Sequence, residues 1–259
     1  MLKDNTLIDS HAHLNLRQYE DDREEVIQRA KGRGVSFFNM GTGLTTSKES
    51  AALAEQYDHV YAAVGFHPHQ ADHFTKDSPQ ILADLAEQEK VLAIGEIGLD
   101  YYRNNSPHED QREAFRAQLE LARNLDLPVS IHNRSSTPDL LEILRDLNSR
   151  PNGVIHSFFG DRELAEAFLD LGFLLGLSGP ITYGDNRDLQ RTLRKLPLSC
   201  LLLETDSPYL TPAPHRGDRN EPAYVRHIAH KLADIKNITF DEVVDHTTAN
   251  TRELFRLNE

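Results

Sequence analysis

Cysteine pairs, long apolar runs and an excess of basic residues are all missing from this chain of 259 residues. No stretch has the roughly 20 apolar residues of a membrane-spanning helix, and a strand-like segment that begins at Thr6 leaves no room for a signal peptide. The single cysteine, Cys200, has no partner for an internal disulfide, which is typical of a reducing compartment. We therefore expect a cytoplasmic protein with no membrane contact and no obligate protein partner.

The charge balance is acidic, with 41 Asp and Glu against 28 Lys and Arg and a formal net charge of −13. This balance argues against a protein that binds duplex DNA through a basic surface. It leaves a nuclease open, because bound divalent metal ions can supply positive charge locally.

Short apolar runs alternate with longer amphipathic stretches along the whole chain. The strand-like runs are Leu7–His11, Val35–Met40, Val60–Gly65, Val91–Glu96, Val129–His132, Gly153–His156, Phe173–Leu177 and Leu201–Thr205. The helix-periodic stretches are Asp22–Arg33, Ser47–Tyr57, Pro79–Gln88, His108–Leu125, Pro138–Leu147, Arg162–Leu171, Asn186–Lys195, Pro222–Ile235 and Phe240–Phe255. This alternation predicts a parallel sheet covered by helices, and eight repeats predict closure into a TIM-type (β/α)8 barrel, regular or distorted.

Two other arrangements stay open on the pattern alone. Seven strands would give much the same pattern, and an open doubly wound sheet is the alternative fold. The open sheet is disfavoured because polar residues end many strands instead of clustering near one switch point. No Pro-, Gly- or Ser-rich linker divides the chain, so residues 1–259 are predicted to form one α/β domain.

Six of the predicted strands end in side chains that bind metals. These are His11 and His13, His67 and His69, Glu96, His132, His156, and Asp206. In a barrel of this type the carboxyl ends of the strands form the active-site face. Residues i and i+2 of a strand point to the same side, so His11 and His13 can hold one ion together. A lone histidine at a strand end is more often a packing residue, and only the whole group predicts a metal site.

The number of candidate ligands exceeds what one tetrahedral ion needs. A carboxylate can bridge two ions, and Glu96 is the best bridge because its strand is central in the order. Imidazole with carboxylate suits Zn²⁺, Mn²⁺, Fe²⁺ or Mg²⁺. Asp9 and Asp100 fit turn or capping roles. Glu204 shares a strand face with Asp206 one layer deeper, where a buried carboxylate would support the ligands.

Several motifs resemble those of the TatD family of metal-dependent deoxyribonucleases, within the amidohydrolase superfamily. They are DSHAHLN, GFHPH, GEIGLDYYR, LPVSIHNR, GVIHSF, LLETDSPYLTP and PHRGDRNEP, in order from Asp9 onward over nearly the whole chain. The resemblance implies a TIM-barrel hydrolase with two divalent ions that cleaves DNA phosphodiesters, with single-stranded DNA and exonucleolytic cleavage expected. It implies one ion held by His11, His13, Glu96 and Asp206, and another held by Glu96, His132 and His156. His67 would contact the substrate phosphate or act as an accessory ligand.

The sequence departs from the family pattern beside the pocket. Asn133 and Ser135 stand where the family commonly has Ser or Thr and an acidic residue. The segment 157–160, SFFG, lacks the small polar residue usual before its glycine. These departures put substrate preference in question and leave metal binding intact.

The implied mechanism uses Asp206 as the base that takes a proton from the attacking water, beside metal ions such as Mg²⁺, Mn²⁺ or Zn²⁺. The candidate phosphate contacts are Arg134, Arg216 and Asn220. Tyr101 and Tyr102 could stack on bases or pack against a helix. A small-molecule amidohydrolase or phosphoesterase of the same superfamily is the alternative function. A catalytically inactive metal-binding protein would show an eroded ligand set, and this set is intact.

Overall fold

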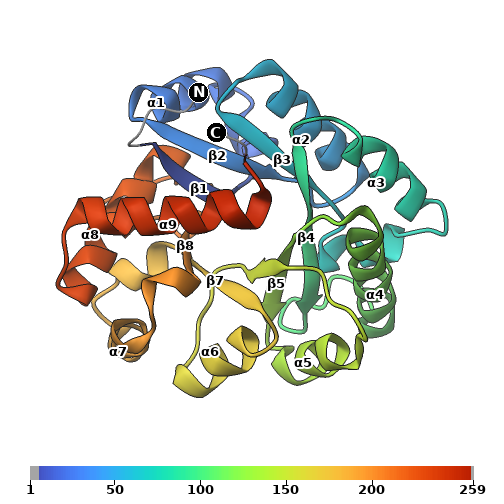
Figure 1. Cartoon of the computed structure of the whole chain (residues 1–259). Helices are drawn as coiled ribbons and strands as arrows, with labels where there is room; N and C mark the ends of the chain where they lie inside the picture. Colours follow the sequence, from blue (N-terminus) through green and yellow to red (C-terminus); the bar gives the residue numbers. More distant parts are fainter. Residues whose placement is uncertain (1–5, 258–259) are drawn as a thin grey trace. The chain divides into compact units, whose positions relative to one another are not determined.

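The computed structural model describes residues 6–257 of the chain. Over these residues, eight parallel strands form one sheet in the order β1 to β8 and alternate with helices (Figure 1). The strands are β1 (Leu7–Ala12), β2 (Val35–Met40), β3 (Val60–Val64), β4 (Val91–Asp100), β5 (Val129–Arg134), β6 (Gly153–Ile155), β7 (Phe173–Leu177) and β8 (Leu201–Leu203). The α-helices are α1 (Arg23–Gly32), α2 (Leu44–Gln56), α3 (Ser78–Ala86), α4 (His108–Leu125), α5 (Thr137–Asp146), α6 (Arg162–Leu169), α7 (Arg187–Lys195), α8 (Val225–Lys236) and α9 (Phe240–Phe255).

The predicted alternation of strands and helices is confirmed, and α4 and α9 have the predicted bounds. Gly34 and Gly172 follow α1 and the end of α6 with φ of +67° and +87°, a conformation that glycine adopts without strain. Strand β4 is longer than predicted. After a shift in register, its last four residues, 97–100, pair with residues 131–134 of β5.

The chain divides into two compact units. The first unit contains the chain up to Phe38, Ser157–Asp170 and the chain from Leu174 onward. The second unit contains Asn39–His156 and Leu171–Phe173. That the full chain acts as one domain stays a prediction.

Within the first unit, the first strand pairs with the chain that leaves the last strand. The backbone N–H of Asp206 donates to the carbonyl of His11 at 2.9 Å, and that of His13 donates to Ser207 at 2.8 Å. Ala12 and Ser207 form a parallel bridge. Pairing of the first and last strands is what closes a barrel, so the predicted (β/α)8 fold class is confirmed.

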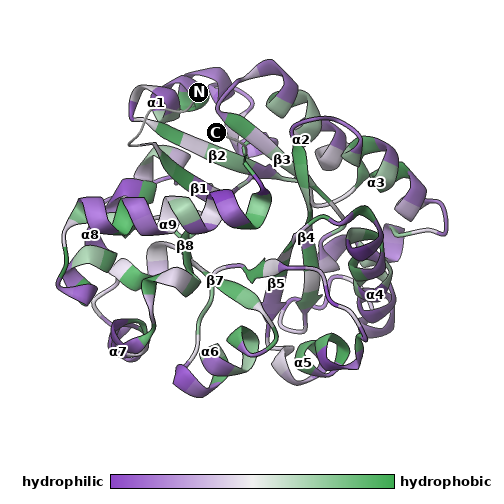
Figure 2. Cartoon of the chain, in the orientation of Figure 1, coloured by the Kyte–Doolittle hydropathy of each residue, from purple (hydrophilic) through white to green (hydrophobic). Residues whose placement is uncertain are grey.

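Buried apolar side chains from strands and inward helix faces build the core. Helix α4 shows the expected two-sided pattern, with hydrophobic and hydrophilic residues on different faces (Figure 2). In the first unit the rings of Phe38 and Phe255 pack 4.1 Å apart, which anchors the end of α9. No helix within residues 6–257 is long and apolar enough to cross a membrane.

Candidate metal centre

The first unit brings His11, His13 and Asp206 together, as the sequence predicts. The Nε2 atoms of His11 and His13 lie 3.1 Å apart, and they lie 3.9 and 3.5 Å from Asp206 Oδ1. Two ligands at about 2.0–2.1 Å from a tetrahedral ion lie about 3.3–3.4 Å from each other. Two imidazoles and a carboxylate with this spacing fit one divalent cation.

Asp9 fixes the backbone next to two members of this group, at His11 and at Thr205 before Asp206. Its buried carboxylate accepts hydrogen bonds from the backbone N–H and hydroxyl of Thr205 at 2.8 and 2.6 Å, and from the backbone N–H of His11 at 3.2 Å. Burial raises the pKa of Asp9 well above its ordinary value, although the Thr205 hydrogen bonds act against this rise. Asp9 was expected in a turn or capping role. In the structure it links β1 to the segment after β8, and it thereby sets the position of His11 relative to Asp206.

The second unit contains another group, His67, Glu96 and His132. His132 Nδ1 lies 2.9 Å from Glu96 Oε1, and His67 Nε2 lies 3.7 Å from the same oxygen. Glu96 is 3% exposed, so its charge needs a cationic partner nearby. Glu96 and His132 were expected as ligands. His67, expected as a phosphate contact or accessory ligand, lies within ligand distance of both.

Asp100 also belongs to the surroundings of the second group. Its Oδ2 lies 2.9 Å from His69 Nε2 and 3.2 Å from His132 Nε2, while its Oδ1 accepts from the backbone N–H groups of Tyr102 and Arg103 at 2.9 Å each. Burial would raise the pKa of Asp100, but these hydrogen bonds, that from His132 first, lower it below its ordinary value. The turn role expected for Asp100 is present, and the same carboxylate also orients two imidazoles.

Two buried glutamines of α4 hold the backbone directly before His67 and at Asp100, the last residue of β4. Gln118 accepts from the backbone N–H of Phe66 at 2.7 Å and donates to its carbonyl at 3.1 Å, directly before His67. Gln111 accepts from the backbone N–H of Asp100 at 2.9 Å and donates to its carbonyl at 3.2 Å. The two glutamines are seven residues apart on one helix face, so a single helix positions both the segment before His67 and the end of β4.

The raised pKa of His132 predicts how the stability of the metal-free protein depends on pH. Burial lowers its pKa, but hydrogen bonds with Asp100 and Glu96 outweigh burial and raise the pKa from 6.5 to about 9. A raised pKa in the folded state stabilises the fold fully below pH 6.5, and that contribution is lost as the pH rises through about 9. Urea unfolding of chelator-treated protein should therefore show a fall in stability over this interval. His132→Gln should flatten the fall, and an identical pH profile in both proteins would contradict the assignment.

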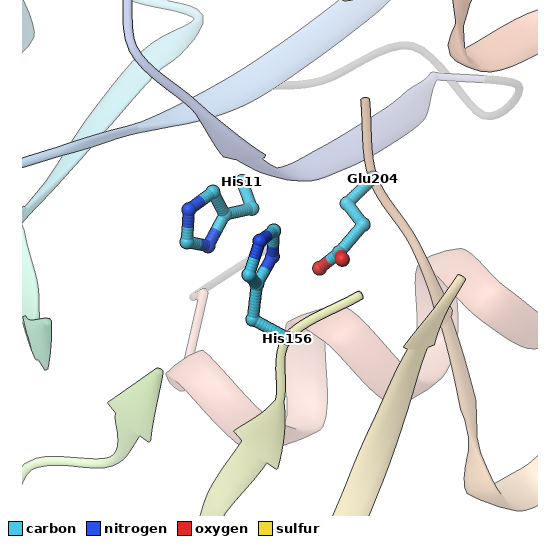
Figure 3. Close-up of side chains that lie close together, drawn as sticks. All are labelled: His11, His156 and Glu204. Carbon is cyan, nitrogen blue, oxygen red and sulfur yellow. The ribbon is translucent and has the colours of Figure 1, made fainter. Parts of the chain in front are cut away.

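Glu204 is a buried residue of the first unit, and its expected role as a support of the ligands stays a prediction. Its carboxylate is fully buried, and Oε1 accepts from the backbone N–H of Ser157 at 2.5 Å. A ligand atom of Glu204 lies within 4.8 Å of one of His11. Figure 3 shows these two side chains together with that of His156, which directly precedes Ser157 in the chain.

Gly176 on β7 leaves the space that the Glu204 carboxylate occupies. A Cβ at this position would lie 2.3 Å from Glu204 Oε2, so the buried carboxylate would have to leave the position in which it accepts the Ser157 hydrogen bond. Gly176→Ala should therefore lower the unfolding free energy by about 1–3 kcal/mol. Chemical denaturation measures this change. Gly184→Ala is the control, because nothing lies within 4 Å of its Cβ position, and equal effects of both substitutions would refute the role of Gly176.

His156 ends the longer segment of the second unit. Its backbone N–H donates to the Ile131 carbonyl at 2.9 Å, and its ring lies 6.5 Å from that of His132 with nearly parallel planes. The side chain is buried, at 6% exposure. Its assignment as a ligand stays a prediction.

The predicted phosphate contacts have different surroundings. Arg134 and Arg216 are exposed, and their guanidinium groups lie over the rings of Tyr102 and Tyr183 at 4.2 and 4.1 Å. Asn220 is fully buried, and its side-chain amide donates to the carbonyls of Thr205 and Tyr209 at 2.9 and 2.6 Å. These contacts support a positioning role for Asn220, on the loop that carries Asp206. The phosphate contacts stay predictions.

The loop after Asp206 is also fixed to α1 by ion pairs. Arg219 donates to both carboxylate oxygens of Asp22 at 2.8 and 2.6 Å, and Arg29 donates to Glu221 at 2.9 and 3.0 Å. The motif PHRGDRNEP thus supplies two ion-pairing residues that anchor the loop in addition to Asn220, and it leaves Arg216 exposed.

A (β/α)8 barrel whose strand ends carry groups of histidines and carboxylates is typical of the class of metal-dependent hydrolases. A family model described as TatD related DNase matches residues 8–256. The chain belongs to this family, and the resemblance stated from its motifs is confirmed. It is a TatD-type metal-dependent hydrolase.

Individual relatives agree with this assignment. The chain is 41% identical over 254 residues to the uncharacterized metal-dependent hydrolase YabD of Bacillus subtilis (strain 168), covering 97% of this chain and 100% of that protein. It is 38% identical over 261 residues to the 3'-5' ssDNA/RNA exonuclease TatD of Pantoea ananatis (strain LMG 20103), with 97% and 100% covered. The crystal structure of YJJV, a TatD homolog from Escherichia coli K12, matches with a TM-score of 0.90 at 33% identity over 97% of this chain and 98% of that one.

Proposed function

We propose that this protein hydrolyses phosphodiester bonds of single-stranded DNA from a chain end, with two divalent metal ions as cofactors. The observation that carries the proposal is the group His11, His13 and Asp206, in which a carboxylate lies beside two imidazoles at ligand distances. A relative with 38% identity named as an exonuclease on single-stranded DNA and RNA supports the choice of substrate.

His11, His13, Glu96 and Asp206 would hold one ion, and Glu96, His132 and His156 the other. When bound, such ions lower the pKa of water toward neutrality and offset negative charge on the phosphate. Mg²⁺, Mn²⁺ and Zn²⁺ all suit this donor set of imidazoles and carboxylates.

Asp206 is the proposed general base. Its carboxylate is partly exposed, at 14%, so one oxygen can face the metal while the other accepts a proton from the attacking water. Asp9 accepts from the backbone N–H of Thr205 before Asp206, and Asn220 donates to the carbonyls of Thr205 and Tyr209 on either side of it, which holds the backbone that carries the carboxylate. Arg134 and Arg216 would neutralise further phosphates of the strand.

A substrate panel tests the proposal. Protein supplied with Mg²⁺ or Mn²⁺ should shorten end-labelled single-stranded DNA progressively and act more slowly on duplex DNA of the same sequence. RNA of that sequence separates DNA from RNA preference. Cleavage of simple phosphoesters or amides without cleavage of any oligonucleotide would refute the proposal and favour a small-molecule hydrolase.

A further inference from the structure

Exposed aromatic side chains follow three of the strands. Among the described residues, the exposed large hydrophobic side chains are Tyr102, Leu125, Phe159 and Tyr209. The three aromatic members come shortly after β4, β6 and β8, at the strand ends that form the active-site face of such a barrel. Rings are favourable to bury, so a ring that stays exposed at this face can offer its surface to a ligand with a planar apolar face of its own.

Tyr209 follows Asp206, a member of the first metal group, by three residues. Its side chain is 49% exposed, and its ring centroid lies 6.5 Å from that of His13 in an edge-to-face arrangement. Its backbone N–H donates to the carbonyl of Asp206 at 2.8 Å. The ring is therefore a direct neighbour of the first metal group and still offers surface to a substrate.

The backbone that carries this ring is held firmly. Buried Asn220 donates from its side chain to the Tyr209 carbonyl at 2.6 Å and from its backbone to the Pro208 carbonyl at 3.2 Å. The Tyr19 hydroxyl in turn donates to the Asn220 carbonyl at 2.5 Å. A pre-ordered exposed ring loses little conformational freedom when a ligand stacks on it, which favours binding.

We infer that Tyr209 is the stacking platform for the nucleobase next to the phosphate that is cleaved. The inference rests on the proposed function and names a contact that selects its substrate. Every base has a flat face, so stacking tolerates any sequence, but a base in a duplex has its faces covered by neighbours. The platform therefore favours unpaired strands. It also supplies affinity to a protein whose net charge of −13 opposes a polyanion.

The test compares two single-stranded oligonucleotides that differ only at the end to be cleaved. One carries a normal terminal nucleotide, and the other carries an abasic residue at that position. Tyr209→Ala should raise KM about 10- to 100-fold on the normal substrate, in line with the usual loss of one base–aromatic stack. It should change KM little on the abasic substrate. Tyr209→Phe, which keeps the ring, should behave like the unmodified protein on both.

The outcomes separate this inference from the proposed function. Cleavage by the unmodified protein, combined with equal KM effects of Tyr209→Ala on both substrates, would show a merely structural role and overturn the platform alone. An unchanged KM for Tyr209→Ala on the normal substrate would do the same. Failure of the unmodified protein to cleave either oligonucleotide would overturn both.

Discussion

Asp206→Asn is expected to lower kcat on single-stranded DNA by about 1,000-fold while the fold and the thermal unfolding midpoint stay nearly unchanged. The magnitude follows from loss of the base that accepts a proton from water, which is usually worth between about 100- and 10,000-fold. Asparagine suits the site because Asp206 has φ of +58°, a left-handed conformation that asparagine tolerates better than most residues. Initial rates at saturating substrate measure the effect.

Asp206→Ala serves as a comparison for backbone strain. Alanine disfavours the left-handed conformation, so this variant should lose stability as well as activity. The asparagine variant should lose activity alone. An asparagine variant with undiminished cleavage would refute the assignment of Asp206 as the base.

Glu96→Gln is expected to abolish most activity by emptying a metal site. Loss of an outer partner of a metal ligand costs about 10- to 100-fold, and loss of a shared ligand should cost more. Glutamine keeps the size of the side chain but removes the charge that faces His132 and His67 at 2.9 and 3.7 Å. Elemental analysis should therefore find about two ions per chain in the unmodified protein and about one in the variant.

Asp139→Asn is the matched control in the same unit. Asp139 is also an acid with hydrogen-bonded partners, since it accepts from the Tyr101 hydroxyl at 2.7 Å and from Arg112 at 3.3 Å. It belongs to neither metal group, so its substitution should leave metal content unchanged. Equal metal content in unmodified protein and Glu96→Gln would contradict the role of Glu96 as a shared ligand.

The fold and much of the candidate site follow from local sequence patterns. The period of the apolar residues separates strands from helices, so α4, α9, β2 and β7 are predicted to the residue. Alternation of side chains along a strand places His11 and His13 on one side. Asp206 is 193 residues beyond His13 in the chain. Closure of the barrel explains why the two side chains nevertheless belong to the same group.

Other features depend on contacts that no local pattern encodes. Asp100 looks like a turn residue because two of its hydrogen bonds are made to the turn that follows it, while those to His69 and His132 connect it to two other segments of the chain, the second of them β5. Gln111 and Gln118 resemble the polar face of an amphipathic helix, yet both are buried. A polar residue on the apolar stripe of α4 is the available signal, and its partners become visible only in three dimensions.

Activity measured against metal equivalents tests the central claim most directly. Chelator-treated protein is titrated with Mn²⁺, and the rate of release of the terminal nucleotide from labelled single-stranded DNA is followed. We predict no release without metal, and a rate that reaches its plateau only near two equivalents per chain. Full activity at one equivalent, or release by metal-free protein, would contradict the two-metal hydrolysis of DNA proposed for this chain.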